Sequence, residues 1–113
     1  MQFMILAHFN ETFNDLSDEE KLEGSHAEWA KSREYYGAGH LRRVWVYDKD
    51  QGIISLFEAD TREQVEMLLA DYPGVKAGWV SAEIRSIEPY WGFFPELADE
   101  KNHVIGHGAA SQS

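Results

Sequence analysis

The sequence predicts an α+β fold in which four strands and two helices follow one another in the order β-α-β-β-α-β. Three observations predict it: short apolar runs, two stretches with helical spacing, and turn or cap residues at the joints between them. The length of 113 residues fits a single folded unit with a modest core. We expect that domain to span residues 1–90, followed by a partly disordered C-terminal tail over residues 91–113.

The first strand and the first helix are predicted from an apolar run and a capping pattern. Residues 2–9 are apolar without strict alternation, which is typical of a strand buried on both faces. Residues 10–16 are polar and are expected to form a loop. Ser17 and Glu20 fit a capping box, so a helix is expected from there to about Tyr36.

The start of this helix has two interpretations. Gly24 interrupts the helical stretch, at a cost of about 1 kcal/mol relative to Ala. Ser25 and Glu28 form a second capping box, so the helix either starts at Ser25 or breaks there. Glu28 is two residues from His26 and is expected on the other side of the helix. The second box explains Glu28 without any catalytic role.

The second half of the chain is predicted to form a hairpin, a helix and a last strand. Residues 40–47 and 53–58 read as strands joined by a polar turn that ends at Gly52. Asp60 or Thr61 caps the next helix. Its apolar stripe at helical spacing is Val65, Leu68, Leu69 and Tyr72.

Two boundaries complete the predicted fold. The dipeptide 73–74, Pro-Gly, is expected to end the second helix, and residues 80–88 form a strand that stops at Pro89. The resulting order is that of the ferredoxin-like split unit. Two helices cover only one face of a four-stranded sheet, yet the strands carry apolar residues in both alternation sets. We therefore expect a homodimer, or a larger homo-oligomer, with sheet packed on sheet.

Composition excludes several classes of partner. The net charge of −10 makes nucleic acid and anionic membranes poor partners, because both need a basic surface. The chain has no Cys, which removes disulfides and thiol chemistry. With no basic leader and no apolar run near the ~20 residues of a membrane span, we expect a cytoplasmic protein.

Residues 28–89 resemble the muconolactone isomerase family of dimeric α+β barrel proteins. The matching residues are Gly39, Arg42, Trp45, the strand 54–58, the helix from Thr61, and Pro89. The strand histidine of the family falls at Arg43 in this chain, and the nearest histidine is His40. The resemblance implies a homo-oligomer with a small hydrophobic pocket. It also implies cofactor-free isomerisation of an unsaturated lactone acid by proton transfer.

A stripe on the first helix supplies candidate catalytic residues. Leu22, Trp29 and Tyr36 recur every seven residues, and His26 and Arg33 share their face. On a buried face His26 would serve as a general acid or base, and Arg33 would hold a carboxylate. Alternatively, His26 is a core histidine bonded to a backbone carbonyl, and Arg33 extends from the edge of the core to solvent. Both interpretations stay open.

The second strand and the end of the first supply the remaining candidates. Strict alternation places His40 and Arg42 on one face, and Leu41, Arg43 and Trp45 on the other. His40 is the second candidate base, while Arg43 and Trp45 are candidate substrate-binding residues. Arg42 matches the family, so which of the two arginines faces the pocket stays open. His8 ends the first strand and either contacts substrate or is an exposed strand-end residue.

No metal or organic cofactor is expected. His103 and His107 are spaced as two ligands would be, but they lie in the predicted tail between glycines. Phosphate-binding loops and nucleophile elbows do not occur in the required context.

The sequence thus predicts an isomerase that moves a proton on a small, apolar, acidic molecule from aromatic-compound degradation. Two alternatives stay open: a cofactor-free monooxygenase or polyketide-tailoring enzyme of the same fold, and a non-catalytic ligand-binding homo-oligomer.

Overall fold

A computed structural model describes residues 1–93 of the chain. Most of the predicted tail, including His103 and His107, lies outside these residues. In chain order the elements are β1 (Gln2–Phe9), α1 (Glu11–Asn14), α2 (Asp18–Gly37), β2 (Leu41–Tyr47), β3 (Gly52–Glu58), α3 (Arg62–Ala70), α4 (Pro73–Lys76), β4 (Val80–Ile87) and the 3-10 turn η1 (Trp91–Phe93).

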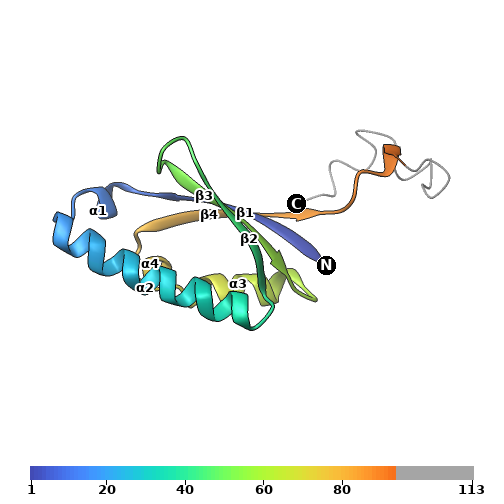
Figure 1. Cartoon of the computed structure of the whole chain (residues 1–113), viewed down its shortest axis with the longest axis horizontal. Helices are drawn as coiled ribbons and strands as arrows, with labels where there is room; N and C mark the ends of the chain where they lie inside the picture. The colour runs from blue at the N-terminus through green and yellow to red at the C-terminus, as the bar shows by residue number, and fades with distance from the viewer. Residues whose placement is uncertain (94–113) are drawn as a thin grey trace.

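The strands form one antiparallel sheet in the order β2-β3-β1-β4. The two central strands are β1 and β3, paired so that Ile5 faces Ser55, and β1 also pairs with β4 so that Ile5 faces Ile84. The helices α2, α3 and α4 all lie on one side of this sheet (Figure 1). The predicted ferredoxin-like α+β order is therefore confirmed.

The helices differ from the prediction in two places. A short helix, α1, occupies part of the predicted loop 10–16, because the Asn10 side chain accepts a hydrogen bond from the Phe13 amide and caps it. Pro73 begins α4 instead of only ending α3, since proline suits the first turn of a helix. The capping box at Ser17 is present, and α2 then continues through Gly24 without a break.

The core lies between the sheet and the helices. Phe3 and Ile5 of β1, Phe57 of β3 and Val65 of α3 are fully buried. Tyr72 is buried beside them, and Leu68 and Leu69 pack against this cluster. The apolar stripe predicted for the second helix is thus confirmed.

A β-bulge in β2 changes the predicted faces of that strand. Leu41 pairs with Phe57, but the register then shifts, so that Arg43 pairs with Leu56. Leu41 is buried in the core, whereas Arg43 and Trp45 face away from the helices. The prediction that Leu41, Arg43 and Trp45 share one face is therefore wrong, because one extra residue in a strand reverses the alternation after it.

On the sheet face opposite the helices, three of the four strands, β1, β2 and β3, carry apolar side chains. Met4, Leu6, Ile54 and Leu56 are only half-buried there, and Trp45 is 42% exposed. An uncovered apolar sheet face is typical of an interface. The homodimer stays a prediction. Among residues 1–93, no helix combines the length and apolar character needed to cross a bilayer.

Gly24→Ala is expected to destabilise the protein. A Cβ at this position would lie 2.7 Å from Cζ3 of Trp79, so either α2 or the indole must shift. We expect the free energy of unfolding in urea to fall by about 1–3 kcal/mol. Gly37→Ala, at the end of the same helix, meets no atom within 4 Å and serves as the control. Equal stability of the two variants would contradict this packing.

Trp45→Glu is expected to weaken self-association, because it places a carboxylate among the apolar side chains of the uncovered sheet face, on the edge strand β2. Light scattering coupled to gel filtration at micromolar concentration measures the mass. Tyr36→Glu, at a 69% exposed position on the other side of the molecule, is the control and should leave the mass unchanged. A monomeric wild type would overturn the predicted homodimer.

Candidate functional site

A cavity of about 410 Å³ lies between the sheet and α2. Its floor is the inner face of the sheet, where every strand contributes a side chain to the lining. Floor residues from the four strands include Ala7, Val44, Val46, Ile53, Ser55 and Ala82. Aromatic side chains form part of the lining, where the Phe9 and Phe13 rings stack with their centroids 4.4 Å apart. Most of the cavity surface is apolar.

One face of α2 supplies most of the polar groups of the cavity. Ser25, Glu28, Trp29, Ser32 and Arg33 line it, at the spacing i, i+3, i+4, i+7 and i+8 of a single helical stripe. Long helices normally turn an apolar stripe inward, so the serines and the glutamate stand out as candidates for function.

The stripe predicted for α2 is wrong about which side is buried. Leu22, Trp29 and Tyr36 are 54%, 53% and 69% exposed, and His26 is also exposed. The face that α2 turns toward the sheet is rotated by about a quarter of a turn about the helix axis from the predicted stripe. Polar and small residues make it the less apolar face, which is why a search for hydrophobic spacing misses it.

Glu28 is the acidic group of this cavity and is half-buried. The backbone amide of Gly74 donates a hydrogen bond to its carboxylate Oε1. A Cβ at position 74 would lie 2.8 Å from that oxygen, so glycine permits the close approach. Burial raises the pKa of Glu28, and the hydrogen bond from Gly74 offsets part of this rise. Glu28 lies on the opposite side of α2 from His26, as predicted, but it is this side that faces the cavity, whereas His26 is exposed.

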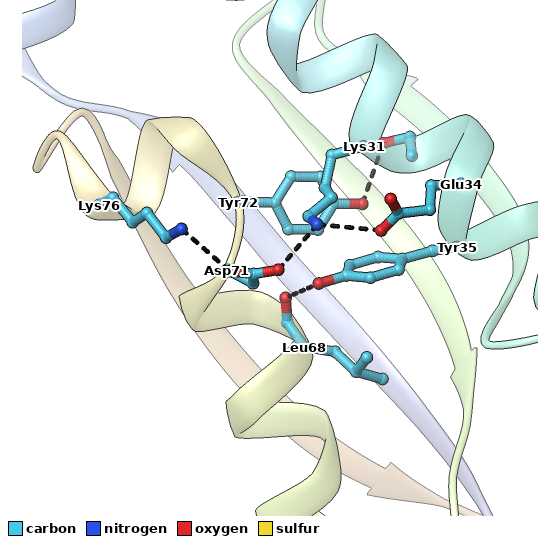
Figure 2. Close-up of polar contacts among 8 residues, drawn as sticks. Lys31, Glu34, Tyr35, Leu68, Asp71, Tyr72 and Lys76 are labelled. Carbon is cyan, nitrogen blue, oxygen red and sulfur yellow. Dashed lines mark hydrogen bonds and ion pairs between the residues drawn. The ribbon is translucent and has the colours of Figure 1, made fainter.

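Two further contacts fasten α2 to the same region of the chain. The Ser32 and Tyr72 hydroxyl oxygens are 2.9 Å apart, and the Tyr35 hydroxyl donates to the carbonyl of Leu68. Lys31 lies outside the cavity and pairs with Asp71 at 2.7 Å, as Figure 2 shows. Hydrogen bonds from Lys31 and Lys76 lower the pKa of Asp71 to about 2.

The predicted site residues divide into two groups. Arg33 lines the cavity on the rim formed by α2. His8 borders the cavity at the end of β1, but alternation from Ala7 turns its side chain to the uncovered face of the sheet. His26 is outside it, although its ring lies 5.3 Å from that of Trp29, which is a lining residue. His40 packs against Tyr35 instead, with ring centroids 6.1 Å apart.

Arg43 and Trp45 lie on the opposite face of the sheet from the cavity. The Arg43 guanidinium stacks on the Trp45 ring, 5.4 Å from its centroid. The bulge at Arg42 places both on the uncovered face, and Arg42 itself is exposed and does not line the cavity. Arg43 and Trp45 therefore cannot reach the cavity of their own chain. The substrate contacts predicted for them stay a prediction that would need a site formed with a second copy of the chain.

Sequence reasoning missed Glu28, Ser32, Ser55 and Tyr72 as cavity residues. The sequence did contain a signal for Glu28 and Ser32, the two missed residues on α2. Together with Ser25 and Tyr35 they recur at spacings of three and four residues, which places them on one side of a helix. No local pattern marks Ser55 or Tyr72, because sheet pairing and helix packing bring them there.

The antiparallel sheet and the single helical layer define an α+β protein of the ferredoxin-like class, with a largely apolar cavity, lined in part by Glu28, between the two layers. Across residues 1–93, no three His, Cys, Asp or Glu side chains gather as a metal site would require.

Residues 1–91 match the sequence model of the muconolactone delta-isomerase family, and the chain belongs to that family. A search of curated protein sequences gives no significant match. Two solved structures share the fold. Muconolactone isomerase is 15% identical, with a TM-score of 0.64, covering 79% of this chain and 92% of that one.

The second structure is 5-chloro-2-hydroxyhydroquinone dehydrochlorinase from Burkholderia phenoliruptrix AC1100, in complex with 2,5-dihydroxybenzoquinone. It is 17% identical to this chain, with a TM-score of 0.61, and the match covers 78% of this chain and 94% of the dehydrochlorinase. At these identities both likenesses show the fold.

Glu28→Gln is expected to change how stability depends on pH. The raised pKa of Glu28 means that its contribution to stability is complete below the ordinary value of 4.5 and is lost as the pH rises through the pKa of the folded protein. Glutamine keeps the acceptor for the Gly74 amide and removes this loss. Urea unfolding between pH 4 and 8 should therefore show the variant gaining on the wild type as the pH rises.

Glu20→Gln provides a comparison of opposite sign. The Ser17 amide donates a hydrogen bond to the Glu20 carboxylate, and this bond together with hydrogen bonding to the Ser17 side chain lowers the pKa of Glu20. This variant should therefore lose stability relative to the wild type as the pH rises. Parallel pH profiles for the two variants would contradict the burial of Glu28.

Proposed function

We propose that the protein is a cofactor-free isomerase that moves a proton between two carbons of a small unsaturated lactone acid, or of a related acidic intermediate of aromatic-compound degradation. The observation that carries the proposal is the carboxylate of Glu28, half-buried in an apolar cavity large enough for a one-ring substrate. Membership of the muconolactone delta-isomerase family supports the choice of reaction.

Glu28 acts as the general base in this mechanism. Its carboxylate removes a proton from the carbon next to the conjugated carbonyl system, and the negative charge passes to the carbonyl oxygen. The same carboxylic acid then returns the proton to the other end of the conjugated system, so substrate and product have the same atoms. Burial raises the pKa of Glu28, which makes the carboxylate a stronger base than a carboxylate in water.

Arg33 is proposed to bind the carboxylate of the substrate at the rim. It lines the cavity on the same helical stripe as Glu28, one residue after Ser32. His8 has no part in this proposal, because strand alternation places its side chain on the same sheet face as Met4 and Leu6. The chain carries a net charge of −10, so an anionic substrate needs a local cation to enter. A guanidinium supplies that charge in a planar fork that fits a carboxylate.

The catalytic roles predicted for His26 and His40 compete with this assignment. Neither ring lines the cavity in one chain, although His26 touches the Trp29 side of the rim. A base on the outer surface of α2 would serve only a site completed by another copy. Substitution of each candidate base separates the two possibilities.

Dehydrochlorination is the second candidate reaction. A structure with the same fold is that of a dehydrochlorinase acting on a chlorinated hydroxyhydroquinone. Such a reaction also begins with proton removal by a base, and it ends with loss of chloride in place of proton return.

Glu28→Gln is expected to lower kcat for isomerisation of muconolactone by ~100-fold or more, because the amide cannot accept the proton. Product formation followed by NMR in D₂O shows whether solvent deuterium enters at the new C–H position. Glu23→Gln, which makes the same change at an exposed position of the same helix, is the control and should retain activity.

Other outcomes decide against the proposal. Full activity in Glu28→Gln with a loss in His26→Ala would transfer the role of base to His26. Chloride release from a chlorinated hydroxyhydroquinone without isomerisation would favour dehydrochlorination. Oxygen consumption would indicate a monooxygenase, and binding without turnover would indicate a non-catalytic binding protein.

A further inference from the structure

A pair of hydroxyl groups lies beside Glu28 on the wall of the cavity. The Ser32 and Tyr72 oxygens are 2.9 Å apart, and both residues line the cavity. Ser32 follows Glu28 by one turn of α2, and Tyr72 precedes Gly74 by two residues. The Glu28–Gly74 and Ser32–Tyr72 hydrogen bonds are therefore neighbouring contacts between the same two segments. One helical turn separates them, about 6 Å along the axis of α2.

This pair has one hydrogen-bond donor to spare. Each hydroxyl carries one proton, and a single bond between the two oxygens uses only one of them. Within residues 1–93, neither hydroxyl makes a second side-chain hydrogen bond. Whichever oxygen accepts within the pair therefore keeps a proton that can be donated to a ligand in the cavity.

Tyr72 is the better placed and the more acidic of the two donors. Its side chain is 9% exposed, and its ring lies edge-on to that of Tyr35 with centroids 5.3 Å apart. The following Pro73 restricts the backbone at the start of α4. Burial raises the pKa of Tyr72, the hydrogen bond with Ser32 offsets part of this rise, and the nearby negative charge of Glu28 adds to it. The net shift is upward, so the phenol stays protonated and can donate at neutral pH.

We propose that Tyr72 is a catalytic residue that donates a hydrogen bond to the substrate oxygen on which negative charge develops, with Ser32 as the positioning residue that orients the phenol. The proposal rests on the proposed function, because proton removal by Glu28 is what creates the charged oxygen. In the charged state Ser32 donates to the Tyr72 oxygen, and Tyr72 donates to the substrate. A donor that is already in place stabilises such an oxyanion strongly in an apolar cavity.

Kinetics provide the first arm of the test. Tyr72→Phe removes the donor and keeps the ring, so kcat for muconolactone should fall by about 100-fold while KM changes little. Ser32→Ala leaves the phenol without its partner and should lower kcat by about 10-fold, again with little change in KM. Tyr36→Phe, on the exposed side of the same helix, is the control. An unchanged kcat in Tyr72→Phe would overturn the proposal.

Binding of a phenolate provides a second arm that needs no turnover. In the Glu28→Gln protein the cavity carboxylate no longer repels an anion, and 4-nitrophenolate can serve as a probe of the donor. Adding Tyr72→Phe should weaken its binding by about 10-fold or more, read from the absorbance of the bound phenolate. Binding of 4-nitroanisole, which has no charged oxygen, should change less than about 2-fold and reports on folding and shape.

The two arms separate the two proposals. If the wild type isomerises nothing but Tyr72→Phe selectively weakens phenolate binding, the donor is retained and the proposed reaction fails. If 4-nitrophenolate and 4-nitroanisole weaken equally, Tyr72 only shapes the cavity and the donor is rejected. If Glu28→Gln abolishes isomerisation while Tyr72→Phe changes neither kcat nor phenolate binding, the proposed function stands and the donor is rejected.

Discussion

The hydrogen bond from the Gly74 amide to the half-buried carboxylate of Glu28 is the contact on which the other features of the site depend. It sets α2 at a fixed height over the sheet, and the neighbouring Ser32–Tyr72 contact repeats the same connection one turn later. Without these two hydrogen bonds, packing the polar face of α2 against the sheet would cost free energy, since buried polar groups are costly when unpaired. The cavity exists because these groups hold the helix where apolar packing does not.

The polar inner face of α2 leaves part of the interior unfilled and places functional groups there. A helix with an apolar inner stripe would fill the space above Ala7, Ser55 and Ala82, and the sheet would be covered without a void. Here the serines and Glu28 leave that space open and provide it with donors and a base. The remaining stability comes from the core cluster, in which Phe3, Phe57 and Val65 are fully buried. Core and site share a wall, because Ile5, Phe57 and Tyr72 belong to the core cluster and also line the cavity.

The sequence carried the order and approximate bounds of the four strands, the capping box at Ser17 and the apolar face of α3, because each depends on local spacing. It also contained Arg33 as a candidate that does line the cavity. The sequence did not reveal which side of α2 faces the sheet. Polar contacts to residues 72–74 determine this orientation, and hydrophobic spacing does not. Tyr72 and Gly74 lie 40 and 46 residues from their partners Ser32 and Glu28, so no local pattern pairs them.

The bulge at Arg42 also affects how this strand can be compared with others. Side chains alternate between the two sheet faces both before and after the inserted residue. After it, however, the odd-numbered residues point to the face that even-numbered residues would otherwise occupy. A position-by-position alignment through β2 therefore equates residues that face opposite sides of the sheet unless a gap is placed at Arg42. A histidine three positions displaced from its expected column can then belong to another surface altogether, as His40 and Arg43 do here. For this strand, side-chain direction is a safer guide to equivalence than residue count.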